Sequence, residues 1–163
     1  MNSVGRVKVR FFVSYAHADD EYADPFIKAL CEMLKPSKTY DFELWRDTEI
    51  LPGETWLKEI EDALKACTLG LLLVSPAFLG SDFITQSELP RFVGNDAKPV
   101  IPVMLRKVNF ERHDLKGLSV TQIYRYKAGA DNYRSFAQCG SGQREEFVYD
   151  LHERIERRLE KLA

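Results

Sequence analysis

The chain has 163 residues, of which 45% are hydrophobic, 12% aromatic and 29% charged. This length fits one compact domain, and the composition excludes disordered, collagenous and low-complexity chains. The 23 Lys and Arg nearly balance the 25 Asp and Glu, so the net charge of −2 creates no bulk field that would favour nucleic acid or an anionic membrane. We therefore expect a single domain over residues 1–163, with its core in residues 6–161.

The cysteine content and the apolar runs indicate the compartment. Cys31, Cys67 and Cys139 are too few and too scattered for a disulfide framework, and none stands in a metal-ligand spacing. The longest apolar run, residues 69–74, is far shorter than the roughly 20 residues of a membrane span, and the N-terminus lacks a signal-peptide pattern. We expect a cytoplasmic protein that binds neither membranes nor nucleic acid and needs no metal or other cofactor.

The first half of the chain alternates strand and helix patterns. A period of two runs through residues 7–13, in which apolar residues alternate with Lys8, Arg10 and Phe12, and it predicts a strand that ends at Ser14. Residues 22–34 have the apolar spacing of one helical face. Residues 42–45 indicate a short second strand, and a loop with a Pro-Gly pair leads into a second helix over residues 56–64.

The second half continues this alternation. The apolar run 69–74 predicts a central strand that is buried on both faces. Residues 81–90 predict a third helix with Ser81 as its cap, and residues 100–105 a fourth strand. Residues 122–126 suggest a short fifth strand, and the four-residue apolar spacing from Phe147 to Leu159 predicts an amphipathic last helix. The segments 109–119 and 128–142 are expected to be loops.

Strands that alternate with helices predict an α/β fold with right-handed crossovers. We expect a three-layer, flavodoxin-like, doubly wound sheet of five parallel strands in the order 2-1-3-4-5. In that order the ligand crevice opens at the carboxyl ends of strands one and three. The loops that meet there begin at Ser14, Arg46 and Ser75.

Several signatures of enzymes are absent from the sequence. It contains no GxxxxGK[ST], GxGxxG, HExxH or GxSxG motif, and its three histidines share no spacing. A response-regulator receiver has the same sheet order but needs acidic residues where this chain has Ser14 and Ser75. Phosphate-loop, zinc-protease, α/β-hydrolase and receiver functions are therefore not expected.

One carboxylate in the crevice loops is a candidate site residue. Glu88 lies seven residues after Ser81, so in a helix capped by Ser81 it shares a face with Ile84, four residues earlier. We expect a helix-surface carboxylate whose substitution changes stability by less than about 1 kcal/mol. Taken alone, such a glutamate is usually solvated and tryptophans such as Trp45 and Trp56 usually belong to the core, so these residues do not by themselves identify a site.

The sequence resembles a Toll/interleukin-1 receptor (TIR) domain, and most of all the bacterial, NAD-cleaving branch of that family. Three motifs occur in the family's order and spacing: FFVSYAH at residues 11–17, WRD at 45–47 followed by Pro52, Gly53, Trp56 and Ile60, and VSPAFL at 74–79 followed by SDFITQSEL at 81–89. The resemblance covers residues 7–105 and extends more loosely through the last helix. It implies the TIR form of the flavodoxin-like fold.

The resemblance also implies a site and a way of assembling. Glu88 matches the catalytic glutamate of the NAD-cleaving members, and the loop Arg46–Glu54 matches the BB loop, through which TIR domains self-associate. The residues expected to bind substrate are Tyr15, Ala16, His17, Trp45, Arg46, Asp47, Leu51, Pro52, Gly53, Trp56, Ser75, Phe78 and Ile84. The sequence departs from the family in two ways: Ile84 stands where the enzymes commonly carry tryptophan, and Ala16 and His17 stand where animal members often carry basic residues.

The implied function is a TIR-type NAD+ glycohydrolase or cyclase. It would cleave the nicotinamide–ribosyl bond of NAD+, its substrate rather than a cofactor, to release nicotinamide and ADP-ribose or a cyclic isomer in bacterial antiphage defence. The main alternative is a non-enzymatic adaptor that pairs with other TIR domains. A third is another N-glycosidic enzyme such as a nucleoside deoxyribosyltransferase. The charged last helix is compatible with fusion to a sensor or oligomerising domain.

Overall fold

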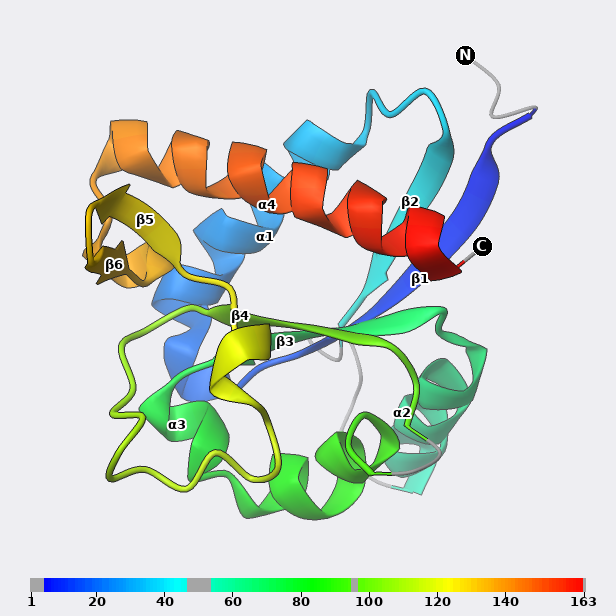
Figure 1. Ribbon diagram of the computed structural model, residues 1–163. Coiled ribbons are helices and arrows are strands. Elements are labelled where there is room, and N and C mark those ends of the chain that lie inside the picture. The colour runs from blue at the N-terminus through cyan, green and yellow to red at the C-terminus, as the bar shows by residue number, and fades with distance from the viewer. Residues whose placement is uncertain (1–4, 47–53, 95–96, 163) are drawn as a thin grey trace.

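A parallel four-stranded sheet forms the centre of the protein (Figure 1). The computed structural model describes residues 5–46, 54–94 and 97–162, and of residues 54–57 only the backbone. The strand order is β2-β1-β3-β4, which confirms the first four positions of the predicted order. The strands are β1 (Val7–Ser14), β2 (Tyr40–Trp45), β3 (Leu69–Val74) and β4 (Val100–Met104).

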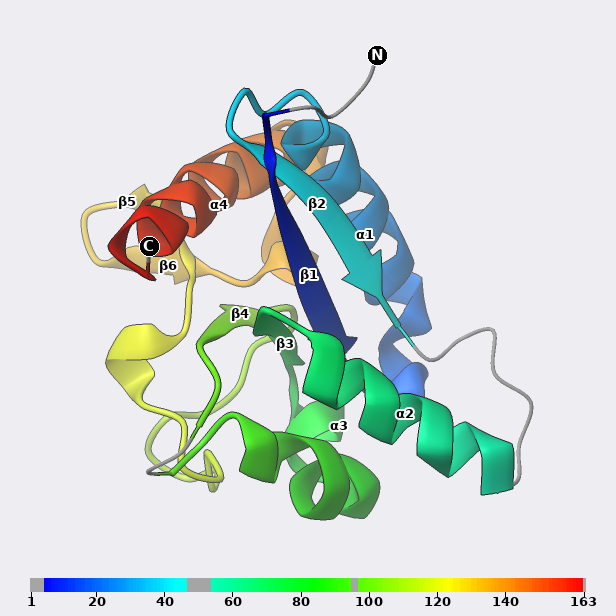
Figure 2. The same ribbon diagram turned by 90° about the vertical axis from the view of Figure 1, so that its right-hand side faces the viewer.

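Helices cover both faces of this sheet and complete the three layers (Figures 1 and 2). One face carries α1 (Asp20–Leu34) and the long α4 (Ser141–Leu162), which pack against each other. The other face carries α2 (Glu54–Ala66) and the short α3 (Pro76–Leu79). This arrangement confirms the flavodoxin-like α/β fold. None of the described helices combines the length and hydropathy that a membrane-spanning helix requires.

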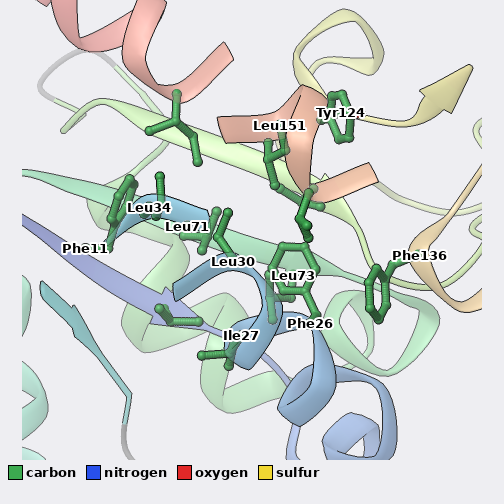
Figure 3. Close-up of a cluster of buried hydrophobic side chains, with 14 of the residues drawn as sticks. Phe11, Phe26, Ile27, Leu30, Leu34, Leu71, Leu73, Tyr124, Phe136 and Leu151 are labelled. Carbon is green, nitrogen blue, oxygen red and sulfur yellow. The ribbon is translucent and has the colours of Figure 1, made fainter. Parts of the chain in front are cut away.

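The period of the apolar residues decides which face each one covers. In β1, Phe11 and Val13 point toward α1 and α4, whereas Phe12 points toward α2. All six residues of β3 are buried, because helices cover the central strand on both sides. Figure 3 shows the core on the α1 and α4 side, where Leu71 and Leu73 of β3 meet aromatic and aliphatic side chains of the two helices.

One position in β3 leaves no space for a side chain. A Cβ added to Gly70 would lie 2.5 Å from Cε1 of Phe92, well inside van der Waals contact. The Phe92 ring therefore rests directly on the backbone of the central strand, and glycine at position 70 allows this close approach.

The short fifth strand predicted over residues 122–126 is reduced to a single residue pair, so the described sheet has four strands where five were expected. Tyr124 forms an isolated parallel bridge with Val103: its N–H donates to the Pro102 carbonyl at 2.8 Å, and its carbonyl accepts from Met104 N–H at 2.9 Å. Residues 120–122 form a 3-10 turn closed by a capping box from Ser119. After the bridge, β5 (Tyr126–Gly129) and β6 (Asn132–Arg134) pair antiparallel with each other, and most of this hairpin lies in the expected loop 128–142.

Candidate active site

The segment after β3 turns Glu88 into the protein. The Ser75 hydroxyl caps α3 by accepting from Phe78 N–H at 3.0 Å, and the Ser81 hydroxyl accepts from Ile84 N–H at 3.2 Å, which fits the predicted cap. Residues Ile84–Glu88 then form a π-helical turn, in which Leu89 N–H donates to the Ile84 carbonyl. Both ends of this turn are buried, with Ile84 and Glu88 each 3% exposed.

Glu88 meets the end of β1 through a short hydrogen bond. The Ser14 hydroxyl donates to Glu88 Oε1 at 2.5 Å, and Ser14 is itself buried. The expectation that Glu88 is a helix-surface carboxylate is therefore wrong: the π-helical turn directs it toward the sheet. Burial of a carboxylate is costly unless hydrogen bonds hold it, so a substitution that removes the side chain will affect folding as well as chemistry.

A second buried carboxylate joins the loops that leave three strands. Asp19 lies in the short 3-10 turn after β1 and is 0% exposed. The Ser75 hydroxyl, at the end of β3, donates to its Oδ2, and Arg106 Nη1, just after β4, donates to its Oδ1 at 2.9 Å. The Asp19 cluster, as we call Asp19, Ser75 and Arg106, fixes the loops beside Glu88 relative to one another.

The sequence did not identify two members of this cluster. Asp19 belongs to the polar stretch after the first strand, and its only signal is a position close to the strand end. Arg106 lies 87 residues further along the chain, and no motif links the two. The sequence predicts Ser14 as a strand end, but nothing in it pairs Ser14 with Glu88.

Tyr15, His17 and Arg46 lie together beside the site. Tyr15 is buried, and burial together with the nearby Asp20 carboxylate raises the pKa of its hydroxyl. The His17 ring centroid lies 5.4 Å from that of Tyr15, and the Arg46 guanidinium lies 6.0 Å from the same ring. Arg46 Nη1 also donates to Asp24 Oδ1 of α1 at 2.6 Å, so this cation is already paired with a carboxylate.

The other expected substrate residues divide between the core and the undescribed part of the chain. Phe78 is fully buried in the core on the α2 side, so its ring contacts other core side chains and is not exposed to a substrate. Ala16 belongs to the same core. Trp45 is half-buried and stacks on Phe12, with ring centroids 5.2 Å apart. Outside the described residues lie Asp47, Leu51, Pro52 and Gly53, as does the side chain of Trp56.

Comparison with known proteins identifies the family. A family model described as TIR domain matches residues 11–138. The chain belongs to the TIR domain family. This TIR chain is also 36% identical, over 98 residues, to the uncharacterized protein y4lF of Sinorhizobium fredii. The match covers 58% of this chain but only 29% of that protein, so the chain spans less than a third of its relative.

Membership places this TIR domain in a family of signalling modules that includes NAD-cleaving enzymes. The family model spans every strand of the sheet apart from the first residues of β1, and it includes Ser14, Asp19, Glu88 and Arg106. The residues that form the two buried carboxylate sites therefore lie within the TIR fold.

Proposed function

We propose that this TIR domain cleaves the nicotinamide–ribosyl bond of NAD+ with Glu88 as its catalytic carboxylate. The observation that supports the proposal best is the position of Glu88. It is a buried carboxylate beside the carboxyl ends of β1 and β3, hydrogen-bonded to a strand-end serine. Ligands of open α/β sheets bind at this edge, and carboxylates in sites of low dielectric act strongly on nearby charge.

One carboxylate is sufficient for this reaction because of the leaving group. Oxidised nicotinamide is a cationic pyridinium, so it departs with the electron pair of the C1′–N bond as a neutral molecule and needs no general acid. The positive charge passes to an oxocarbenium-like ribosyl group. The Glu88 carboxylate stabilises this charge, as carboxylates do in glycoside hydrolysis. Water then adds at C1′ and loses a proton to give ADP-ribose, or an adenine nitrogen adds to give a cyclic isomer.

Ser14 acts in this scheme as a positioning residue. Its hydroxyl holds Oε1 and so fixes the plane of the Glu88 carboxylate. Ser14→Ala is expected to lower kcat about 10- to 100-fold with little change in KM, because small misplacements of a catalytic group have effects of that order. Ser14→Thr keeps the hydroxyl and should restore most of the rate. Equal losses in Ala and Thr variants that fold normally would argue against the positioning role.

The decisive test is nicotinamide release from NAD+, with the products identified by mass. Glu88→Gln keeps the shape and an acceptor for Ser14, so the variant should fold while losing the activity. Gln86→Ala is a matched control, because Gln86 lies on the same π-helical turn but is exposed. Wild-type rates in a folded Glu88→Gln protein would falsify the assignment. Cleavage of free nucleosides in place of NAD+ would favour a deoxyribosyltransferase.

We place this activity in bacterial antiphage defence and expect it to depend on self-association through the BB loop, Arg46–Glu54. Two observations support the dependence: TIR domains pair with other TIR domains, and this loop combines apolar Ile50, Leu51 and Pro52 with charged neighbours, as interaction surfaces do. A domain that associates but releases no nicotinamide at any concentration would instead be an adaptor module.

A further inference from the structure

A second concave surface lies between α4 and the chain that follows β4. The α4 groove, as we call it, has a volume of about 700 Å³. Its floor is formed by residues 100–102 of β4 together with Ile123 and Tyr124, and the C-terminal half of α4 forms one wall. Figure 1 shows this half of α4 in red on one side of β4 and the yellow turn Val120–Gln122 close to the same strand.

The charged residues that line the α4 groove are all basic. Four come from α4, at positions 154, 157, 158 and 161, and the fifth is Arg125 opposite them. Two acidic residues of this half of α4, Glu156 and Glu160, lie near Tyr40 of β2, where they help burial to raise the pKa of that tyrosine. The five cations of the lining outnumber the two carboxylates that pair with them in the described chain, Asp150 and Glu153, so the groove keeps a positive potential.

Several of these cations have no carboxylate partner in the part of the chain that the structure describes. Arg154 pairs with Asp150 at 3.5 Å and Arg157 with Glu153 at 3.7 Å, both exposed pairs within the helix. Among the described residues, no ion pair joins Arg125, Arg158 or Lys161 to an acidic side chain. An anionic ligand would thus meet cations whose charge the protein does not already neutralise.

The groove also offers an aromatic surface. Tyr133 of β6 is 41% exposed, and the Arg125 guanidinium lies 4.1 Å from its ring centroid. Arg125 also lies 4.9 Å from the centroid of the Phe110 ring. An arginine close to two aromatic rings, one of them an exposed tyrosine, provides planar groups on which a nucleobase can stack.

We infer that the α4 groove binds a nucleotide with two or more phosphates. The phosphates lie against Arg158 and Lys161, and the base stacks on Tyr133. The volume falls in the range of small-molecule sites, and the apolar floor with a few charged groups at the rim is typical of them. A long nucleic acid fits less well, because Glu153, Glu156 and Glu160 of the same helix limit the basic surface to the groove itself.

This site is separate from Glu88. The groove is walled by α4, which packs on the α1 side of the sheet, and its lining includes neither Glu88 nor Ser14. Ile84, the first residue of the turn that carries Glu88, and Leu89, directly after that turn, pack instead in the core on the α2 side. Nucleotide binding in the groove thus does not depend on NAD+ cleavage, and the two proposals can fail independently.

The test is titration calorimetry of the TIR domain with ATP, which lacks the nicotinamide–ribosyl bond. We expect saturable binding with a dissociation constant below about 1 mM, weakened by added NaCl. Arg158→Glu combined with Lys161→Glu should weaken it about tenfold or more, because two phosphate-binding cations are reversed. Lys28→Glu combined with Lys58→Glu is the matched control, since both lysines are exposed, lie outside the groove and change the net charge equally.

Two further measurements separate this site from other sources of binding. Tyr133→Ala should weaken ATP several-fold but leave inorganic tripolyphosphate unchanged, and Glu88→Gln should bind ATP like the wild type. The inference is overturned if ATP does not saturate, if the Lys28 and Lys58 control loses as much affinity as the groove variant, or if Glu88→Gln abolishes binding. It is also overturned if tripolyphosphate binds as tightly as ATP, or if a poly-glutamate peptide binds where ATP does not.

Discussion

Replacing Arg106 with methionine tests the Asp19 cluster directly. Methionine keeps much of the apolar stem of arginine but removes the guanidinium that donates to Asp19 Oδ1. Asp19 is completely buried, whereas the Arg106 side chain is 40% exposed. Exposed ion pairs contribute about 0.2–1 kcal/mol, and loss of one partner of a fully buried pair costs about 3–5 kcal/mol. The half-buried pair should lie between these limits, at about 2 kcal/mol.

Thermal and urea unfolding measure this loss. For a domain of this size, about 2 kcal/mol corresponds to a fall in Tm of about 4–8 °C. Asp19→Asn removes the buried charge, so in the double variant the loss of Arg106 should cost about 1 kcal/mol less than in the wild type. Arg112→Met is the control, because Arg112 is exposed in the same connection after β4. A shift below about 0.5 kcal/mol in Arg106→Met, or strictly additive effects in the double variant, would refute the reasoning.

Three other predictions concern packing, alkaline stability and assembly. Gly70→Ala should lower the free energy of unfolding by about 1–3 kcal/mol, and Phe92→Leu should recover part of this loss; an Ala variant as stable as the wild type would contradict the close approach. Burial raises the pKa of Tyr15 and Tyr124 above the unfolded value of 10.0, so stability from these groups is present below about pH 10 and falls by up to about 1.4 kcal/mol per pH unit for each as pH rises further. Urea unfolding between pH 8 and 11 should show this slope, and Tyr→Phe variants that leave it unchanged would exclude these tyrosines as its source. The rate of nicotinamide release per protein molecule should rise with protein concentration, because only the associated fraction is competent. A constant rate per molecule from a protein that light scattering shows to be monomeric would exclude assembly as a requirement.

The sheet could be predicted from the sequence because burial imposes a period on it. Alternation in residues 7–13 set the two faces of β1, and the unbroken apolar run marked β3 as the central strand with its observed bounds, Leu69–Val74. The fifth strand is shorter than the sequence predicts. Only Tyr124 pairs with β4, and the residues from Tyr126 onward pair with β6 instead.

The site was predictable only in part. Glu88 and Ser75 could be found from the TIR motifs, but the contacts that hold them could not. Asp19 and Arg106 meet only because the sheet brings the ends of β1 and β4 together, and no local pattern encodes such a pairing. The spacing from Ser81 predicts an α-helix with Glu88 on its surface, whereas the chain forms a π-helical turn in which Glu88 is buried.

That turn also restricts how this segment can vary in length. An α-helix rotates about 100° per residue, so removing one residue between Ile84 and Glu88 would restore the regular backbone bonding but rotate one of the two side chains away from the core. Thr85 and Gln86 can change in chemistry without this effect, since they lie between the two buried positions. Across homologues, insertions and deletions here should be rarer than substitutions.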